Sequence, residues 1–409
     1  MSDTTYAISS VGPGDRYIQA EVDALLEREG IHRDQHLDYT AAMLDEDYHV
    51  IATGSLFGNT LRCMAVSSDH QGESLMNAIV SHLIEVQYSR GNYHLFLYTK
   101  CDSARFFGNL GFYEITRVPE ENIVFMENKR TGFRDYLAAL QRETKQAEIS
   151  GQDVTDGDDP AAGHPAEAAD QAEANAGGPV TSHPAGAIVA AGGACDAGPT
   201  ALNQSGRVGA IVMNANPFTL GHRYLVEQAR AACDVLHLFM VSEDVSLVPF
   251  SVRKKLILEG TKDIPGIVYH EAGSYIISSA TFPAYFQKGD NAVIRSQAGI
   301  DANIFTQIAA ALGITDRFVG DEPTSVVTGI YNEILSTALP EAGVACHIIP
   351  RKEADGKAIS ASTVRSCIHD GRLEDIRSLV PETTYRYFTS PEAAPVIERI
   401  RAAEEVVHY

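Results

Sequence analysis

One stretch of the chain, residues 146–206, lacks the composition of a folded core and therefore divides the protein in two. It contains nine acidic residues and no Lys or Arg, and most of its other residues are Ala, Gly, Pro, Ser and Thr. Such a segment buries too little apolar surface to offset the entropy lost on ordering. We predict a flexible acidic linker over residues 141–206, between folded blocks over residues 1–140 and 207–409.

Composition and charge restrict the class of protein. Of the 409 residues, 44% are hydrophobic and 21% are charged, as in an ordinary globular protein. The sequence has no apolar run of roughly 18 residues and no basic start followed by an apolar stretch, so we expect neither a membrane nor a secreted protein. Six scattered cysteines without a CxxC spacing indicate reduced thiols in a cytoplasmic protein. The net charge of −22 argues against a nucleic-acid partner, which needs a basic face.

The first block has the pattern of an α+β domain. Helices are predicted over residues 15–28 and 75–88, and strands over residues 49–56, 60–66 and 93–98. Gly58 and Asn59 predict a turn between the first two strands. A short helix is predicted over residues 104–110, ended by Gly111 in the left-handed conformation.

The second block alternates strands and helices. Strands are predicted over residues 208–213, 235–241, 266–270, 291–295 and 317–319, and helices over residues 221–232, 251–259 and 300–312. This alternation is typical of a parallel sheet with helices on both faces. Ligands of such folds bind at the carboxyl ends of the strands, where the strand order reverses.

Residues 214–222, which read N-A-N-P-F-T-L-G-H, join the first strand of this block to its first helix. Thr219 and His222 lie one helical turn apart, so both can face one ligand. Gly221 allows close approach of the backbone, and the helix N-terminus favours an anion. A nucleotide phosphate fits this pattern, although a histidine near a helix start is, taken alone, more often structural.

Residues 359–365, which read I-S-A-S-T-V-R, form the second informative stretch. Ser360 and Ser362 can cap a helix and donate hydroxyl hydrogen bonds, and Arg365 follows one turn later. The planar guanidinium fork suits a phosphate. Taken alone, a serine-rich stretch of this kind is usually only a helix cap.

Together and in this order, the two stretches resemble the TxGH/HxGH and ISxTxxR signatures of the nucleotidyltransferase superfamily. Residues 274–286, 317–323 and 331–333 narrow the resemblance to the citrate lyase ligase family. The resemblance implies a Rossmann-like α/β domain in the second block, with reaction at the α-phosphorus of ATP.

The first block resembles GNAT acyltransferases in residues 104–114 and in the strand–loop–helix that begins at Met64. Its loop reads D-H-Q-G-E-S over residues 69–74, and the carboxylate of Asp69 would repel a pyrophosphate. We therefore do not expect this domain to turn over acetyl-CoA. The citrate lyase ligase resemblance implies instead that it docks a CoA-like arm. Gly72, Ser74 and Asn109 are the candidate residues for that arm.

The citrate lyase ligase resemblance implies a two-step ligation. Acetate attacks ATP to give acetyl-adenylate and pyrophosphate. The thiol of the CoA-like prosthetic group on the acyl carrier subunit of citrate lyase then takes the acetyl group and releases AMP. ATP is thus a substrate, and Mg²⁺ is expected to bridge its phosphates without a dedicated protein metal site.

The resemblance also implies roles for particular residues. The candidate catalytic residues are His222, Thr219 and Arg365. The candidate phosphate-binding residues are Asn214, Asn216, Phe218, Gly221, Ser360, Ser362 and Thr363. A possible substrate loop contains Ser279, Thr281 and Lys288.

Two other functions stay open at this point. The chain could adenylate a phosphorylated coenzyme precursor, or it could be a GNAT acyltransferase whose second domain senses nucleotide. Arg253, Lys254 and Lys255 could reach a phosphate, but we predict that they form a solvated face.

Overall fold

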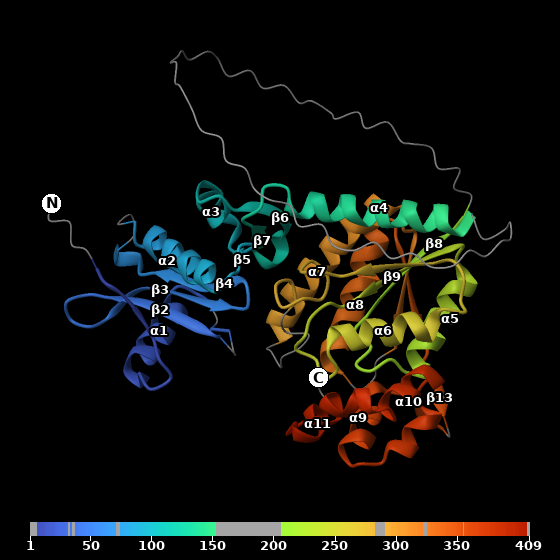
Figure 1. Cartoon of the computed structure of the whole chain (residues 1–409). Coiled ribbons are helices and arrows are strands. Elements are labelled where there is room, and N and C mark those ends of the chain that lie inside the picture. The colour runs from blue at the N-terminus through green and yellow to red at the C-terminus, as the bar shows by residue number, and fades with distance from the viewer. Residues whose placement is uncertain are drawn as a thin grey trace, which may run out of the picture.

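A computed structural model of the chain (Figure 1) describes residues 6–31, 33–34, 37–70, 74–152, 206–282, 291–321, 325–354 and 356–406. Residues 153–205 of the predicted linker, together with Gly72 and Lys288, lie outside the described residues. None of the described helices combines the length and the apolarity that a membrane span requires.

The N-terminal block folds around a seven-stranded sheet in the order β1-β2-β3-β4-β5-β7-β6. Its strands are β1 (Ile8–Ser10), β2 (Tyr39–Leu44), β3 (Val50–Phe57), β4 (Thr60–Val66), β5 (Phe96–Thr99), β6 (Tyr113–Val118) and β7 (Ile123–Glu127). All neighbours are antiparallel except β4 and β5, which run parallel and pair only at Thr60–Phe96 and Leu61–Leu97. The two strands therefore stop pairing early along their length.

Three helices accompany this sheet: α1 (Arg16–Arg28), α2 (Leu75–Ser89) and α3 (Ala104–Asn109). Helix α2 connects the parallel strands β4 and β5 and packs closely on β3. A Cβ at Gly54 of β3 would lie 2.6 Å from the side chain of Ile79, so glycine is needed for this approach. The mixed sheet with its β4-α2-β5 crossover confirms the predicted α+β, GNAT-like fold.

The C-terminal block contains a parallel sheet in the order β10-β9-β8-β11-β12. Its strands are β8 (Val208–Met213), β9 (Val235–Met240), β10 (Ile267–Glu271), β11 (Asp316–Gly320) and β12 (Ala345–Ile349), and its helices are α5 (Leu220–Ala232), α6 (Phe250–Thr261), α7 (Asn291–Leu312) and α8 (Val326–Glu341). The strand order reverses between β8 and β11. This confirms the predicted Rossmann-like architecture.

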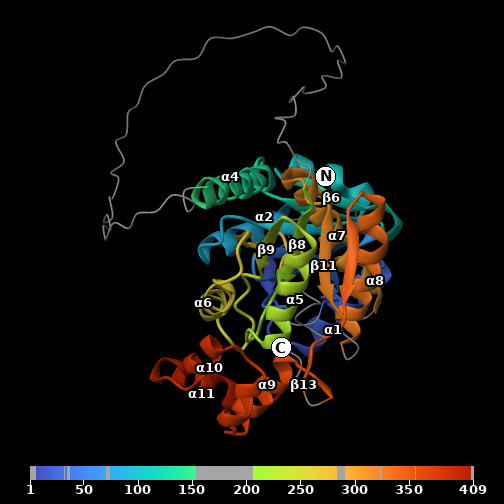
Figure 2. The ribbon, with the colours of Figure 1, turned by 90° about the vertical axis from the view of Figure 1, so that its right-hand side faces the viewer.

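A further helical group completes the chain at the end of the molecule opposite α4 (Figures 1 and 2). It consists of the hairpin β13 (Glu353–Ala354) and β14 (Lys357–Ala358), followed by α9 (Ala361–His369), α10 (Glu382–Phe388) and α11 (Ala394–Ala402). Short 3₁₀ turns connect these helices.

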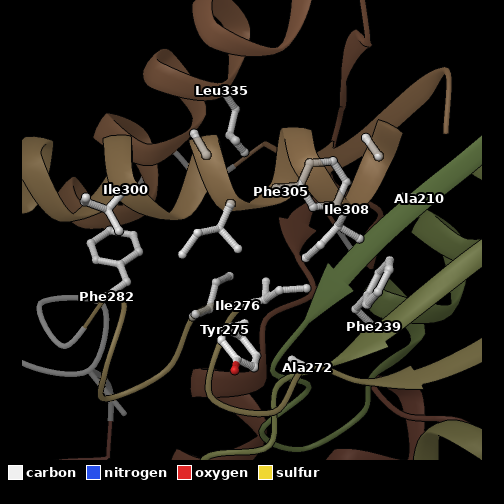
Figure 3. Packing of buried hydrophobic residues seen from close by; sticks show 14 of the residues in the cluster. Ala210, Phe239, Ala272, Tyr275, Ile276, Phe282, Ile300, Phe305, Ile308 and Leu335 are labelled. Carbon is white, nitrogen blue, oxygen red and sulfur yellow. The ribbon is translucent and has the colours of Figure 1, made fainter. Parts of the chain in front are cut away.

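Two hydrophobic clusters cover the two faces of the parallel sheet, because side chains alternate along a strand. On β8, Ala210 belongs to the cluster with α4, α7 and α8, whereas Ile211 belongs to the cluster with α5, α6 and α9–α11. Figure 3 shows α7 directing Ile300 toward Phe282 of the loop after β10. The first cluster also contains Phe125 from the N-terminal block, so the two blocks share a core.

Helix α4 (Gly132–Gln152) corrects the predicted start of the linker at residue 141. It packs against α7 and β10 of the C-terminal block, and Leu140 is buried there. Tertiary packing of an apolar face therefore extends the helix into a polar sequence.

The predicted strand over residues 291–295 is wrong, because these residues begin α7. Ile294, Gln297, Ala298 and Asp301 are all buried, and their spacing is that of one helical face. Gly299 interrupts the apolar pattern and hides the continuity of the helix in the sequence.

Two buried histidines on adjacent strands link the sheet to α4. Nδ1 of His237 and Nε2 of His270 lie 2.9 Å apart, and Nδ1 of His270 lies 2.5 Å from a carboxylate oxygen of Glu143. Burial lowers the pKa of His237 to about 3, and that of His270 to about 4. Both rings are therefore neutral at neutral pH.

This arrangement predicts a loss of stability in mild acid. An unfolded histidine binds a proton near pH 6.5, whereas the folded protein resists protonation until a much lower pH. The stabilisation is complete above pH 6.5 and is lost as the pH falls toward the folded pKa values. Lowering the pH from 7.5 to 5.5 should cost roughly 1.4 kcal/mol of unfolding free energy per histidine.

Urea unfolding of wild type and of His237→Leu at the two pH values measures this effect. The loss of unfolding free energy between pH 7.5 and pH 5.5 should be about 1.4 kcal/mol smaller in the variant than in wild type. His369→Gln is the matched control, because His369 is exposed and should leave the pH dependence unchanged. Equal pH dependence in His237→Leu and wild type would contradict the prediction.

Candidate functional site

A cavity of about 590 Å³ opens at the carboxyl ends of the central strands of the parallel sheet. Its lining comes from the ends of β8, β11 and β12, the first turns of α5, α8 and α9, and the loop after β10. This is the position where the strand order reverses, as the alternating pattern predicts. Of the predicted site residues, the cavity brings together Asn214, Asn216, Thr219, Gly221, His222, Ser360, Ser362 and Arg365.

The first turn of α5 holds the His222 ring in one orientation. Thr219 is the N-cap, and its Oγ1 accepts from the backbone N–H of His222 at 3.3 Å. In return, Nδ1 of His222 accepts from the backbone N–H of Thr219 at 3.1 Å. Because Nδ1 is an acceptor, the proton of the neutral ring lies on Nε2, which is the donor that the ring can offer to a ligand.

The charge state of His222 is set by its surroundings. Burial, together with the positive charges of Arg351 and Arg365, lowers its pKa to about 4. The ring is therefore a neutral hydrogen-bond donor at physiological pH. The same two guanidinium groups make this end of the cavity attractive to an anion.

The two sequence motifs meet through close backbone packing. A Cβ at Gly221 would lie 3.1 Å from the carbonyl oxygen of Ile359, which precedes α9. Arg365 is buried, and it donates from Nη1 to the carbonyl of Asn216 and from Nε to the carbonyl of Val406. Burial lowers the pKa of Arg365 to about 10, so the side chain stays charged while it joins the two motifs.

Two predicted phosphate-binding residues have supporting positions and are not among the cavity-lining residues. Phe218 is fully buried and stacks on the His222 ring with the centroids 5.9 Å apart. Thr363 is exposed, and its N–H donates to Oγ of Ser360, the N-cap of α9. Both residues shape the motif rather than the surface that a ligand would touch.

Arg253 is a buried scaffold residue, which corrects the prediction of a solvated basic face. Its guanidinium donates to the carbonyls of Asn214, Val241 and Val248 at 2.7–2.9 Å and also to that of Glu243. These carbonyls belong to the loops after β8 and β9, so one side chain holds the rim of the cavity. Its neighbours Lys254 and Lys255 pair with exposed glutamates, as a solvated face would.

The predicted substrate loop is present, but Ser279 and Thr281 do not line the cavity. The N–H and the hydroxyl of Ser279 both donate to the carboxylate of Glu243, and Thr281 donates to buried Asp301. Their polar groups are used to shape the loop. Ile277 is the residue of the described segment 274–282 that lines the cavity.

The N-terminal block holds this same loop. Arg62 and Tyr98 follow the last paired positions of β4 and β5, where the two strands separate. Arg62 donates to the carbonyl of Ser279 at 3.1 Å, and the hydroxyl of Tyr98 lies within 2.6 Å of the carbonyls of Ala280 and Thr281. A loop of the C-terminal block thus binds at the place where β4 and β5 separate.

The candidate residues for a prosthetic arm are not gathered at the cavity. Ser74 is exposed at the N-cap of α2, with φ of +57°, and Asn109 is exposed at the end of α3. Both belong to the N-terminal block. Their role in docking stays a prediction.

Sequence reasoning missed several cavity residues. Arg317 on β11, Tyr331 on α8, and Arg351 and Lys352 after β12 all line the cavity. The signal for the last two was the rule that ligands lie beyond the carboxyl ends of parallel strands. Strand β12, which precedes Arg351 and Lys352, is not among the predicted strands, so the rule could not be applied to its carboxyl end.

Comparisons with known proteins address the whole chain and its parts. The family described as "Citrate lyase ligase C-terminal domain" matches residues 208–388. The [citrate [pro-3S]-lyase] ligase of Escherichia coli K12 is 35% identical over 83% of this chain and 82% of its own length. The corresponding ligase of Haemophilus influenzae is 32% identical over 90% of this chain and 93% of its own length.

Solved structures resemble the N-terminal block. A GNAT-family acetyltransferase from Staphylococcus aureus Mu50 aligns over 30% of this chain and 100% of its own length, with 16% identity and a TM-score of 0.25. An acyl-CoA N-acyltransferase from Pseudomonas aeruginosa aligns over 31% and 100%, with 12% identity and a TM-score of 0.27.

Proposed function

The chain belongs to the citrate lyase ligase family, and from that premise we propose that it activates citrate lyase by ATP-dependent acetylation of the thiol prosthetic group on the acyl carrier subunit. Family membership makes it an enzyme of the ligase kind that acts on citrate lyase. The acetyl donor, the adenylate and the products AMP and pyrophosphate belong to our proposal.

The observation that carries the proposal is the neutral, oriented His222 in a cavity that Arg351, Lys352 and Arg365 also line. In the first step, a carboxylate oxygen of acetate attacks the α-phosphorus of ATP, and the bond to the bridging oxygen of pyrophosphate breaks. Negative charge grows on the phosphate oxygens. The Nε2–H of His222 and the N–H of Gly221 at the start of α5 would stabilise that charge.

The leaving pyrophosphate needs cationic partners. Arg351, Lys352 and Arg365 line the cavity, and so do Ser360 and Ser362, whose hydroxyls lie 2.9 Å apart. Mg²⁺ would bind mainly to the phosphates of ATP and neutralise part of their charge. Among the described residues, no group of three His, Cys, Asp or Glu side chains could hold a metal ion, and Asp321 supplies a carboxylate to the lining.

In the second step, the thiolate of the prosthetic group attacks the carbonyl carbon of acetyl-adenylate. The carbon–oxygen bond to the phosphate breaks, the thioester forms, and AMP leaves. The chain's contribution is to hold the mixed anhydride in the cavity and to keep the α-phosphate bound until AMP has left.

The test is acetate-dependent exchange of labelled pyrophosphate into ATP, with Mg²⁺ and no carrier protein. We expect exchange only when acetate is present, because the first step is reversible. Adding deacetylated citrate lyase should then give AMP and thioester-bound acetate in equal amounts. Exchange that ignores acetate, or AMP formation without thioester, would contradict the proposal.

A further inference from the structure

Three residues from separate elements line one part of the cavity and surround the same buried carboxylate. The backbone N–H of Ile277 donates to Oδ1 of Asp301 at 2.6 Å, and the hydroxyl of Tyr331 donates to Oδ2 at 2.6 Å. The positive charge of Arg317 also acts on Asp301. Ile277, Tyr331 and Arg317 belong to neither nucleotide motif, yet all three line the cavity.

Arg317 brings a buried positive charge to this part of the cavity. Its side chain is 1% exposed, and its guanidinium carbon lies 4.3 Å from the centroid of the Phe305 ring. Stacking on an aromatic face holds the planar fork in place. A fixed guanidinium fork is the side-chain group best matched to a carboxylate.

Ile277 adds an apolar wall in a strained conformation. Its φ is +43°, which is unfavourable for a β-branched residue, and such strain persists where the surroundings over-determine it. Its N–H is held by Asp301, and the loop that follows is held at two further residues. Glu243 and Arg62 bind Ser279, and Tyr98 binds the carbonyl of Ala280. The structure thus holds a bulky side chain at a position where glycine would fit more easily.

We propose that Arg317, Ile277 and Tyr331 form the site for the acid that is adenylated, and that this acid is a short-chain aliphatic carboxylate. Arg317 receives the carboxylate, and Ile277 limits the length of the chain behind it. Tyr331 is a positioning residue. Its hydroxyl holds Asp301, which in turn holds the backbone N–H of Ile277. The proposal rests on the adenylating function proposed above and adds the place and the size limit of the acid substrate.

The test compares acetate, propionate and butyrate in pyrophosphate exchange by the full-length wild type and by Ile277→Gly. Glycine accepts the positive φ, so the loop can keep its course while the wall is removed. The ratio of kcat/KM for butyrate to that for acetate should rise at least about 10–200-fold, the discrimination that a single methylene group gives in an apolar pocket. Ile277→Val, which keeps the branched wall, should stay near the wild-type ratio.

A second variant tests the charge. Arg317→Lys keeps a positive charge but loses the fork, and it should raise KM for acetate at least about tenfold while KM for ATP stays unchanged. If the wild type shows acid-dependent exchange but Ile277→Gly has the same butyrate-to-acetate ratio of kcat/KM, the inference is overturned and the proposed function stands. Absence of acid-dependent exchange in the wild type would instead overturn the proposed function, and this site with it.

Discussion

Replacing His222 by alanine should slow acetate-dependent pyrophosphate exchange by about 10²–10³-fold, as the loss of one preorganised donor typically does. The ring is held by Thr219 from one side and by Phe218 from another, so it is ready before the ligand binds. Alanine removes the Nε2–H donor but leaves the helix N-terminus and the arginines in place. The expected loss is mainly in kcat, because the donor acts on charge that grows in the transition state.

The pH dependence of exchange gives a second view of His222. Because its pKa is lowered to about 4, the ring should remain neutral between pH 8 and about pH 5, and its contribution should not change over that range. His369→Ala, at the exposed end of α9, is the matched control and should retain wild-type exchange. Near-normal exchange by His222→Ala would remove this residue from the mechanism.

Replacing Arg253 by methionine should lower the free energy of unfolding by roughly 3–5 kcal/mol. Methionine fills much of the same volume but donates no hydrogen bond. The carbonyls that Arg253 now satisfies belong to the loops after β8 and β9, and a buried acceptor left without a donor costs about 1–3 kcal/mol. Urea unfolding followed by circular dichroism measures the loss.

Lys254→Met is the matched control for this stability prediction. Lys254 is the next residue of α6, but its side chain is 41% exposed and pairs with Glu271 at the surface. Surface ion pairs contribute little, so this variant should unfold close to wild type. If Arg253→Met were as stable as Lys254→Met, Arg253 would not be the residue that holds the cavity rim.

The two motifs at residues 214–222 and 359–365 could be located from the sequence because each depends on short-range order. Thr219 is an N-cap and His222 lies one turn later, so their mutual geometry follows once the helix is recognised. Ser360 and Arg365 are related in the same way on α9. The parallel sheet followed from strand–helix alternation, and that sheet type places ligands at the carboxyl ends of its strands.

Residues whose roles depend on distant neighbours could not be placed in this way. Arg253 has the sequence context of a solvated helix face, and only the fold brings four loop carbonyls around its guanidinium. Ser279 and Thr281 look like ligand-facing hydroxyls until Glu243 and Asp301 are found beside them. Residues 291–295 have the pattern of a short strand, and only the packing of Ile294, Gln297 and Ala298 on one buried face shows that they begin α7.

The presence of two folded blocks, the α+β pattern of the first, the parallel α/β pattern of the second, and the one-turn spacing of Thr219 and His222 follow from composition, periodicity and local spacing. Tertiary structure alone decided that Arg62 and Tyr98 hold a loop about two hundred residues away, and that Ile277, Arg317 and Tyr331 meet around Asp301. The reason is physical. A cap or a helical face forms between residues a few positions apart, whereas a cavity wall forms only when separate elements pack and bury their polar groups together.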